Sequence, residues 1–153
     1  MTKSGISGVV FFPLKSFQDD RGWLCELFRD DRLEEFHRPA MGYVSQTLPG
    51  VSRGPHEHES QSDLFCFVGP GDFELVLWQD FGSGDPYKEV HIVGESNPVS
   101  VVVPPGVIHA YRNVSDKPGI VFNFPNRLYG GPGGAYPVDE IRHESDPRSP
   151  YLI

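Results

Sequence analysis

The stretch Leu64–Trp78, LFCFVGPGDFELVLW, contains the clearest structural pattern in this chain. Two runs rich in aromatic and aliphatic residues, Leu64–Val68 and Phe73–Trp78, are joined through the turn-forming sequence VGPGD. Runs of this composition and length favour strands, and a short connection that contains Gly and Pro is typical of a hairpin. The sequence therefore predicts a β-hairpin here.

Short runs of the same kind recur along the rest of the chain. They lie at Val9–Phe12, Trp23–Phe28, Val90–Val93, Ser100–Val103 and Gly119–Phe124. The 17 Gly and 15 Pro residues supply turns between them. We expect one such turn at Pro104-Pro105-Gly106, because neither proline can donate a hydrogen bond to a sheet. Short strands at regular spacing favour a β-sandwich or β-barrel.

One segment, Asp30–Arg38 (DDRLEEFHR), has a helical pattern instead. Leu33 and Phe36 are three residues apart, acidic residues occupy the first turn, and Pro39 follows the end. We therefore expect an all-β fold with one or two short helices.

The size and charge of the chain restrict its architecture and its partners. Its 153 residues suit a single domain. Residues from about 126 to 153 are irregular in pattern, so we expect them to form a C-terminal wrap over the surface. The formal net charge of −8 disfavours nucleic acids and anionic membranes as partners. No apolar run approaches the roughly 18 residues of a membrane-spanning helix.

The N-terminus and the cysteines indicate the compartment. Met1–Gly8 is polar and lacks the apolar segment of a signal peptide. Cys25 and Cys66 are too few for a framework of several disulfides, so two free, buried thiols in a reducing compartment are the simpler interpretation. We therefore expect a cytoplasmic protein.

The densest group of chemically active residues is Arg53–His58, RGPHEH. His56 and His58 point to the same side of an extended segment, and His109 follows the predicted turn at the start of another strand. Three imidazoles that converge inside a barrel indicate either a metal site or acid–base chemistry. Arg53 suits an anionic substrate group such as a phosphate. The remaining histidines are interpreted as ordinary polar residues: His37, His91 and His143.

Two segments resemble the motifs of the cupin superfamily. Gly50, His56-x-His58 and Asp63 resemble its first motif, with Asp where the pattern has Glu. Pro104–Asn113, PPGVIHAYRN, is similar to the second motif at every fixed position. The resemblance implies that residues 1–153 form a single cupin domain, a small β-barrel or double-sheet jelly roll. It indicates the fold more directly than the function.

Within the cupins, the chain from about Val9 to Asp146 resembles the dTDP-4-dehydrorhamnose 3,5-epimerase family of nucleotide-sugar enzymes. DDRGW at 19–23 and RGPH at 53–56 are similar to that family's binding segments. The resemblance implies that Arg21 and Glu26 bind the nucleotide, that Arg53 binds the diphosphate and that His56 is the catalytic base. His58 and His109 would then line the substrate site.

The chain departs from this family at the proton donor, which is a Tyr in a late Leu-Tyr-Lys segment. The corresponding strand here is Ile120–Asn123, and Phe122 has no proton to give. We expect Tyr129 to serve as the acid, with Tyr111 as the alternative. The family's Lys after the catalytic His is also absent, and His58 is an additional residue. A His-x-His at this position resembles the nucleotide-sugar 3,4-ketoisomerases.

The resemblance implies an epimerase of a nucleotide-linked 4-keto-6-deoxy sugar in polysaccharide biosynthesis. It would abstract a proton next to the ketone and reprotonate the enolate, without a cofactor or metal, and we expect a homodimer. The first alternative is a 3,4-ketoisomerase in which His58 is essential. The second is a metal-dependent cupin with His56, His58 and His109 on Fe, Mn or Zn, completed by Asp63 or Gln61. The third is a non-catalytic sugar-binding cupin.

The resemblance also implies a hydrogen-bonded pair of His56 and Asp146. A base that takes a proton from carbon must present one defined ring nitrogen, and an acceptor on the other nitrogen secures it. The competing acceptors are Asp139, Glu140 and Glu144. Alternatively, Asp146 only begins a turn before the proline that follows it.

Overall fold

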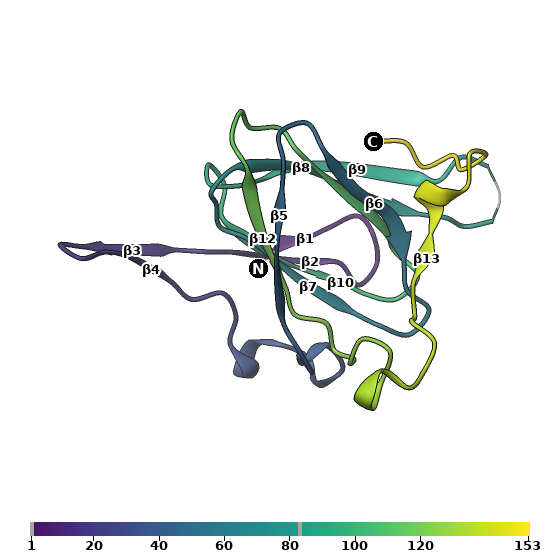
Figure 1. Ribbon diagram of the computed structural model, residues 1–153, viewed down its shortest axis with the longest axis horizontal. Helices are drawn as coiled ribbons and strands as arrows, with labels where there is room; N and C mark the ends of the chain where they lie inside the picture. Colours follow the sequence, from purple (N-terminus) through teal and green to yellow (C-terminus); the bar gives the residue numbers. More distant parts are fainter. Residues whose placement is uncertain (1, 83) are drawn as a thin grey trace.

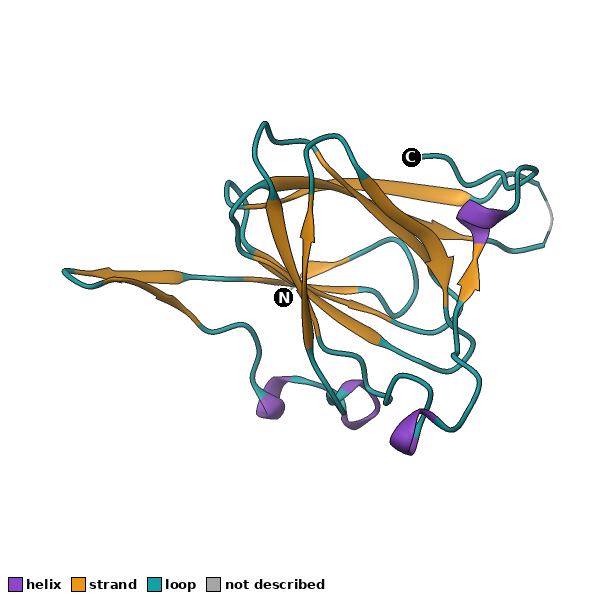
Figure 2. Cartoon of the chain, viewed as in Figure 1, coloured by secondary structure: helices purple, strands orange, loops and turns teal. Residues whose placement is uncertain are grey.

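The computed structural model describes residues 2–82 and 84–153, which form two facing antiparallel sheets and a projecting two-stranded arm (Figures 1 and 2). The six-stranded sheet has the order β1 (Thr2–Lys3), β2 (Val10–Pro13), β10 (Val99–Val103), β7 (Asp63–Phe67), β12 (Gly119–Asn123), β5 (Tyr43–Thr47). The five-stranded sheet has the order β13 (Ile141–Arg142), β6 (Ser52–Glu57), β11 (Ile108–Asn113), β8 (Asp72–Gln79), β9 (Tyr87–Gly94). The arm pairs β3 (Ser16–Asp19) with β4 (Gly22–Cys25). The predicted all-β jelly roll is confirmed.

The main core lies between the two sheets, where every second residue of each strand points inward. Phe65 and Phe67 of β7 and Phe73 of β8 surround Tyr111 of β11, with ring centroids 5.6 to 5.9 Å apart in edge-to-face arrangements. Leu75, on β8, is also fully buried. Aromatic pairs in this geometry add to the free energy gained from apolar burial.

The predicted hairpin between the runs of Leu64–Trp78 is wrong. β7 pairs with β10 and β12 in one sheet, whereas β8 pairs with β11 and β9 in the other. The connection crosses from sheet to sheet, and Gly71 (φ +90°) passes so close to Gly119 that a Cβ would lie 2.9 Å from its Cα. Both strands are central strands with partners on each side. A short loop by itself does not distinguish a hairpin from a sheet crossing.

The helix predicted over Asp30–Arg38 is also wrong. The segment forms two single-turn 3-10 helices, η1 (Asp30–Arg32) and η2 (Glu35–His37), separated by Leu33 and Glu34 in extended conformations. Leu33 packs into a second core cluster with Leu64, Cys66 and Val102 on the outer face of the six-stranded sheet. Because so short a helix gains little from its own hydrogen bonds, this burial decides the conformation.

Most of the other predicted strands are confirmed. The remaining strands form where predicted, although β4 covers only the start of Trp23–Phe28, and residues 104–106 make the expected turn. After β12 the chain contains two further 3-10 turns, η3 (Pro132–Gly134) and η4 (His143–Ser145), around β13. It ends with Tyr151 packed against Trp78 on the outer face of the five-stranded sheet.

Both cysteines are free, but only Cys66 is buried; Cys25 is half-buried, so that part of the expectation is wrong. Cys25 ends the exposed arm, whereas Cys66 lies in the middle of β7, between two neighbouring strands. Among residues 2–82 and 84–153, no helix has the length and apolar character needed to cross a membrane.

Candidate active site

A cavity of about 400 Å³ opens where the two sheets separate at one end of the barrel. His56 on β6 lies directly opposite His109 on β11 in the sheet register, and Asp63 begins β7 on the facing sheet. We call this cavity the histidine pocket. Its lining comprises Met41, Tyr43, His56, His58, Gln61, Asp63, Pro125, Tyr129, Val138, Glu140 and Arg142.

The position of His56 depends on a close approach of two strands. Gly54 has a φ of +83°, and a Cβ there would lie 2.6 Å from the carbonyl oxygen of His109. Only glycine fits this position without strain. The register between β6 and β11 shifts just beyond it, between His109 and Tyr111, as in a β-bulge. The irregularity turns His56 toward the interior beside His109.

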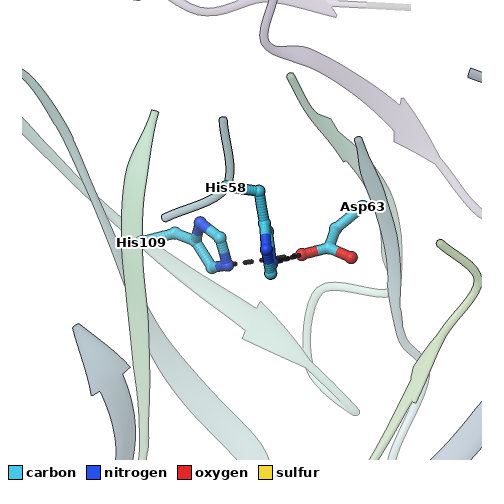
Figure 3. A group of neighbouring side chains, drawn as sticks. All are labelled: His58, Asp63 and His109. Atoms are coloured by element: carbon cyan, nitrogen blue, oxygen red, sulfur yellow. Dashed lines mark ion pairs between the residues drawn. The ribbon is translucent and has the colours of Figure 1, made fainter. Parts of the chain in front are cut away.

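His58, Asp63 and His109 form a buried cluster at the base of this pocket (Figure 3). One carboxylate oxygen of Asp63, Oδ2, lies 3.1 Å from Nε2 of His58 and 3.4 Å from Nε2 of His109. His58 Nδ1 contacts the backbone carbonyl of Asp139, and His109 Nδ1 donates to the carbonyl of Val107 at 3.0 Å. Both rings therefore direct Nε2 at the same carboxylate.

The second oxygen of Asp63 is satisfied as well. Its Oδ1 accepts hydrogen bonds from Gln61 Nε2 and Asn123 Nδ2, each at 3.0 Å. Burial alone would raise the pKa of Asp63, but the contacts with His109 and His58 hold it below its usual range. Burial likewise opposes the charged form of His58, yet the bond to Asp63 outweighs it and raises the pKa of His58. Asp63 and His58 therefore form a buried ion pair.

Asp139 fixes the loop that carries this pair. Its carboxylate accepts backbone hydrogen bonds from Glu59, Ser60 and Gln61 at 2.8 to 2.9 Å, while its own carbonyl contacts His58. The C-terminal segment thus orients His58 from outside the barrel. In the sequence Asp139 is only one of several candidate acceptors, and its separation of 81 residues from His58 hides this role.

His56 differs from His58 because its surroundings disfavour the charged form. Burial and the adjacent imidazoles of His109 and His58 lower the pKa of His56 to about 3. Its Nδ1 lies 3.7 Å from Glu140 Oε1 and 4.0 Å from Glu144 Oε1. A neutral imidazole can accept a proton, and these carboxylates are placed to stabilise the cation that then forms.

The predicted pair of His56 and Asp146 is wrong. Asp146 points to solvent, with its side chain 44% exposed, and binds Arg148 at 3.1 Å. The carboxylate also accepts the backbone N–H of Arg148, so Asp146 caps a local turn. Glu140 and Glu144, the competing candidates, occupy the place that the prediction gave to Asp146.

Arg21 and Glu26 do not line the histidine pocket of their own chain. Arg21 stands at the tip of the projecting arm, 89% exposed and paired with Asp19 (Figure 1). Glu26 follows the arm and pairs with Arg29 at 3.6 Å. The expectation that they share one cavity mouth with Arg53 is therefore wrong within a single chain. The arm makes no turn back toward the barrel, and this path was not evident from the sequence.

Arg53 connects the two sheets from a position on β6 three residues before His56, and it is not among the residues that line the pocket. From β6 it donates to Thr47 Oγ1 at 2.9 Å and to the carbonyl of Gln46 at 2.8 Å, both on β5. These bonds use two of the five N–H groups of the guanidinium, and the residue is exposed. Arg53 is thus a fixed cation with free donors at the edge of the barrel.

The tyrosines near the pocket differ in position. Tyr129 lines its mouth and is 65% exposed, whereas Tyr111 lies in the aromatic core with its hydroxyl 3.2 Å from Ser45.

Phe122, the residue at the expected position of the proton donor, packs outward against the second core cluster. Asn123 is the inward residue of that strand, and Tyr43 faces it across the register. Sequence reasoning missed Tyr43, whose only signal is its place in an alternating edge strand.

The buried cluster also has the donor types of a metal site. Its three ligand atoms lie within 4.8 Å of one another, and His109 Nε2 is a buried nitrogen without a hydrogen-bond partner in the described chain. Two imidazoles and a carboxylate suit Zn²⁺ or another transition metal. The residues present therefore fit such an ion, which His58, Asp63 and His109 would hold with one ligand atom each.

Comparison with known proteins places this geometry in context. The chain is 36% identical over 129 residues to the spore coat polysaccharide biosynthesis protein SpsL of Bacillus subtilis (strain 168), covering 81% of this chain and 82% of that protein. It is 34% identical over 114 residues to the probable low-salt glycan biosynthesis epimerase Agl13 of Haloferax volcanii, covering 72% of each.

Solved structures share the architecture. The dTDP-4-dehydrorhamnose 3,5-epimerase from Sulfolobus tokodaii superposes with a TM-score of 0.71 at 21% identity, covering 92% of this chain and 79% of that chain. At this identity the likeness shows a common fold. No protein-family model matches the chain.

Proposed function

The chain belongs to the cupin-type family of sugar epimerases of polysaccharide and glycan biosynthesis, and we propose that its substrate is a nucleotide-linked 4-keto-6-deoxy sugar. The observation that carries the proposal is the neutral His56, which is 18% exposed and lines a pocket that also holds a nearby carboxylate and two tyrosines. These are the groups that enolisation next to a ketone requires: a base, a charge to stabilise it and a proton donor.

The reaction begins with a weak carbon acid. His56 removes the proton from the carbon next to the ketone, and the electrons of that bond pass into an enolate. Glu140 stabilises the imidazolium that forms, because its carboxylate is 3.7 Å from Nδ1. Reprotonation from the opposite face then inverts the carbon. Tyr129, the acid expected from the sequence, and Tyr43 are the two candidate donors in the pocket.

Recognition of the diphosphate is assigned to Arg53. A protein with a net charge of −8 needs fixed cations to hold such a group. Arg53 is anchored by two hydrogen bonds and keeps other N–H groups free, which suits bidentate contact with phosphate oxygens. His58 lines the site, and the buried His109 packs against His56; both shape the site rather than carry the proton.

The ring contacts of His58 favour an epimerase over a 3,4-ketoisomerase. In the ketoisomerase, His58 would have to exchange protons with the substrate. Here both of its ring nitrogens are occupied, by the Asp139 carbonyl and by Asp63. His56 lies 3.7 and 4.0 Å from its two neighbouring carboxylates, farther than His58 lies from Asp63. His56 is therefore the histidine that can exchange a proton with the substrate.

The second candidate function is metal binding by His58, Asp63 and His109. Nε2 of His109 supports it, because this buried nitrogen lies 3.4 Å from Asp63 Oδ2 yet makes no well-formed hydrogen bond within the described residues. When bound, a divalent ion would supply a Lewis acid for the ketone oxygen. Elemental analysis of the purified protein decides the question: an equimolar transition metal whose removal by chelator abolishes activity supports this candidate, and activity in metal-free protein contradicts it.

A homodimer explains the projecting arm. The arm exposes Phe17, Trp23 and Leu24, each more than half accessible, and carries Arg21 away from its own pocket. Docked on a second copy, it would bury these side chains and bring a cation toward the partner's site. Light scattering should give a dimer, and Trp23→Asp should give a monomer. A cytoplasmic location belongs to the same proposal, since both thiols are free.

Proton exchange tests the proposed function directly. The protein is incubated with dTDP-4-keto-6-deoxyglucose in D₂O, and NMR follows the protons next to the ketone. We expect deuterium to enter with wild type and the rate to fall at least about a thousandfold with His56→Gln. The matched control is His143→Gln, which lies outside the pocket and should exchange normally. Wild-type protein that neither exchanges deuterium nor forms an epimer would contradict the proposal.

A further inference from the structure

We propose that Tyr43 is the proton donor that completes the epimerisation begun by His56. The inference rests on the proposed function and assigns a residue that the sequence comparison of motifs did not identify. Tyr43 begins β5, the edge strand of the six-stranded sheet, and lines the histidine pocket. His56 lines the same pocket from β6 of the facing sheet. Base and donor therefore come from different sheets.

The hydroxyl of Tyr43 is held at a defined place by Asn123. Tyr43 and Asn123 are directly opposite in the register of β5 and β12, and Asn123 Nδ2 is 2.8 Å from the Tyr43 oxygen. Asn123 is 2% exposed, so its amide is fixed by packing. Although Tyr43 is 48% exposed as a residue, its hydroxyl lies against the buried amide of Asn123.

The direction of this hydrogen bond follows from Asp63. The Asn123 amide nitrogen lies 3.0 Å from Asp63 Oδ1, and a carboxylate can only accept. The amide nitrogen therefore faces Asp63, and its second N–H must donate to Tyr43. Because the Tyr43 oxygen accepts this bond, its own hydrogen is left for another acceptor. In the pocket, that acceptor is the substrate carbon.

The protonation state of Tyr43 suits a donor. Burial raises the pKa of Tyr43 to about 12, and the negative charge of Asp63 acts in the same direction. The hydroxyl thus keeps its proton at neutral pH. The N–H of Asn123 opposes this shift and stabilises the phenolate once the proton has left.

Tyr129 is less well placed for the same task. It lies before the glycine pair Gly130–Gly131, in a loop, and is 65% exposed at the pocket mouth. A proton donor must hold its position to within a fraction of an ångström, which favours a strand residue with an anchored hydroxyl. The expected donor position is on β12, where the inward residue opposite Tyr43 is Asn123. The tyrosine proposed here lies on the neighbouring strand, β5.

The proton balance of the step is complete. His56 gains the proton from the carbon, and the C–H electrons form the enolate. The Tyr43 O–H bond then breaks, its proton joins the carbon on the opposite face, and the ketone is restored. His56 ends with one extra proton and Tyr43 with one fewer. Exchange with water returns both to their starting states.

The experiment separates proton removal from inversion. Tyr43→Phe, the rival-donor variant Tyr129→Phe and the matched control Tyr87→Phe, which lies on β9 outside the pocket, are incubated with dTDP-4-keto-6-deoxyglucose in D₂O, and NMR measures deuterium uptake and epimer formation separately. In Tyr43→Phe, His56 still removes and returns the proton on one face. We therefore expect uptake within about fivefold of wild type and at least about a hundredfold loss of epimer. Tyr129→Phe should change neither rate by more than about fivefold.

The outcomes are distinct. Wild-type epimer formation in Tyr43→Phe, or uptake without epimer in Tyr129→Phe instead, overturns the role of Tyr43 and leaves the proposed function standing. Wild-type protein that shows neither uptake nor epimer overturns both. The melting temperature of Tyr43→Phe confirms that it folds. As a second variant, Tyr43→His retains a titratable donor and should form epimer at least about tenfold faster than Tyr43→Phe.

Discussion

The two ends of the barrel interior are built by the same strands and differ in chemistry. On the inner face of β7, Asp63 at one end is followed by Phe65 and Phe67, and on β11 His109 is followed by Tyr111. The far end is an aromatic core with edge-to-face contacts, while the near end holds an ion pair and an open pocket. On each of these strands, a residue of the reactive pocket and a residue of the stabilising aromatic core are only two positions apart.

Packing at the aromatic end must provide the folding stability that is lost by burying charged groups at the polar end. Removing Asp63 and His58 from water is unfavourable, and their mutual attraction only partly compensates. Burial of the large apolar rings contributes stability in proportion to their area. The site can therefore keep a neutral His56 and a charged pair close together because the rest of the interior is well packed.

The largest expected effect tests whether the aromatic end serves stability alone. Phe67 is fully buried, so Phe67→Ala should lower the free energy of unfolding in urea by about 4 kcal/mol. The folded protein should still exchange deuterium within about threefold of wild type, because Phe67 does not line the pocket. The matched control is Phe81→Ala, which is 68% exposed and should change stability by less than about 0.5 kcal/mol. A folded Phe67→Ala protein without activity would show that the two ends are coupled.

Local features of the interior were predictable from the sequence, and long-range ones were not. Strand positions follow from alternation, and the convergence of His56, His58 and His109 follows from strand direction and one turn. The sheet crossing after β7 was not predictable, because a loop sequence does not reveal which strands later become its neighbours. The partners Asp139 and Glu140 were equally hidden, since several acidic residues in an irregular segment have no periodicity to rank them.

The same limit applies to the proton donor. Phe122 matched the expected position by linear comparison, but the register of β12 turns it outward and brings Asn123 inside. Tyr43 becomes visible only when β5 is paired with β12, because 80 residues separate Tyr43 from Asn123.

The next effect is a pH dependence that belongs to the polar end. The pKa of His56 is about 3 in the folded protein and about 6.5 in an unfolded chain. Between these values the unfolded state binds more protons, so stability falls as the pH falls. From pH 7 to pH 4 this group should cost about 3 kcal/mol. Urea unfolding of wild type and His56→Gln should therefore differ in slope against pH between these limits. Parallel curves would show that His56 has the same pKa in the folded protein as in the unfolded chain.

The smallest effect concerns the group that supports His56. Glu140 is 3.7 Å from His56 Nδ1, with its side chain 17% exposed, and Arg142 holds its other oxygen at 2.7 Å. Glu140→Gln keeps this shape but removes the charge that stabilises the imidazolium. Deuterium uptake should fall about tenfold, equivalent to about 1.4 kcal/mol in the barrier, with little change in stability.

Two control variants rank the neighbouring carboxylates. Glu144→Gln, whose carboxylate is 4.0 Å from His56 and 34% exposed, should slow deuterium uptake less than Glu140→Gln does. Asp146→Asn should cost nothing, because its carboxylate serves Arg148 at the surface. If Asp146→Asn slows uptake more than Glu140→Gln, the C-terminal segment rearranges when substrate binds, and the polar end is completed only in the complex.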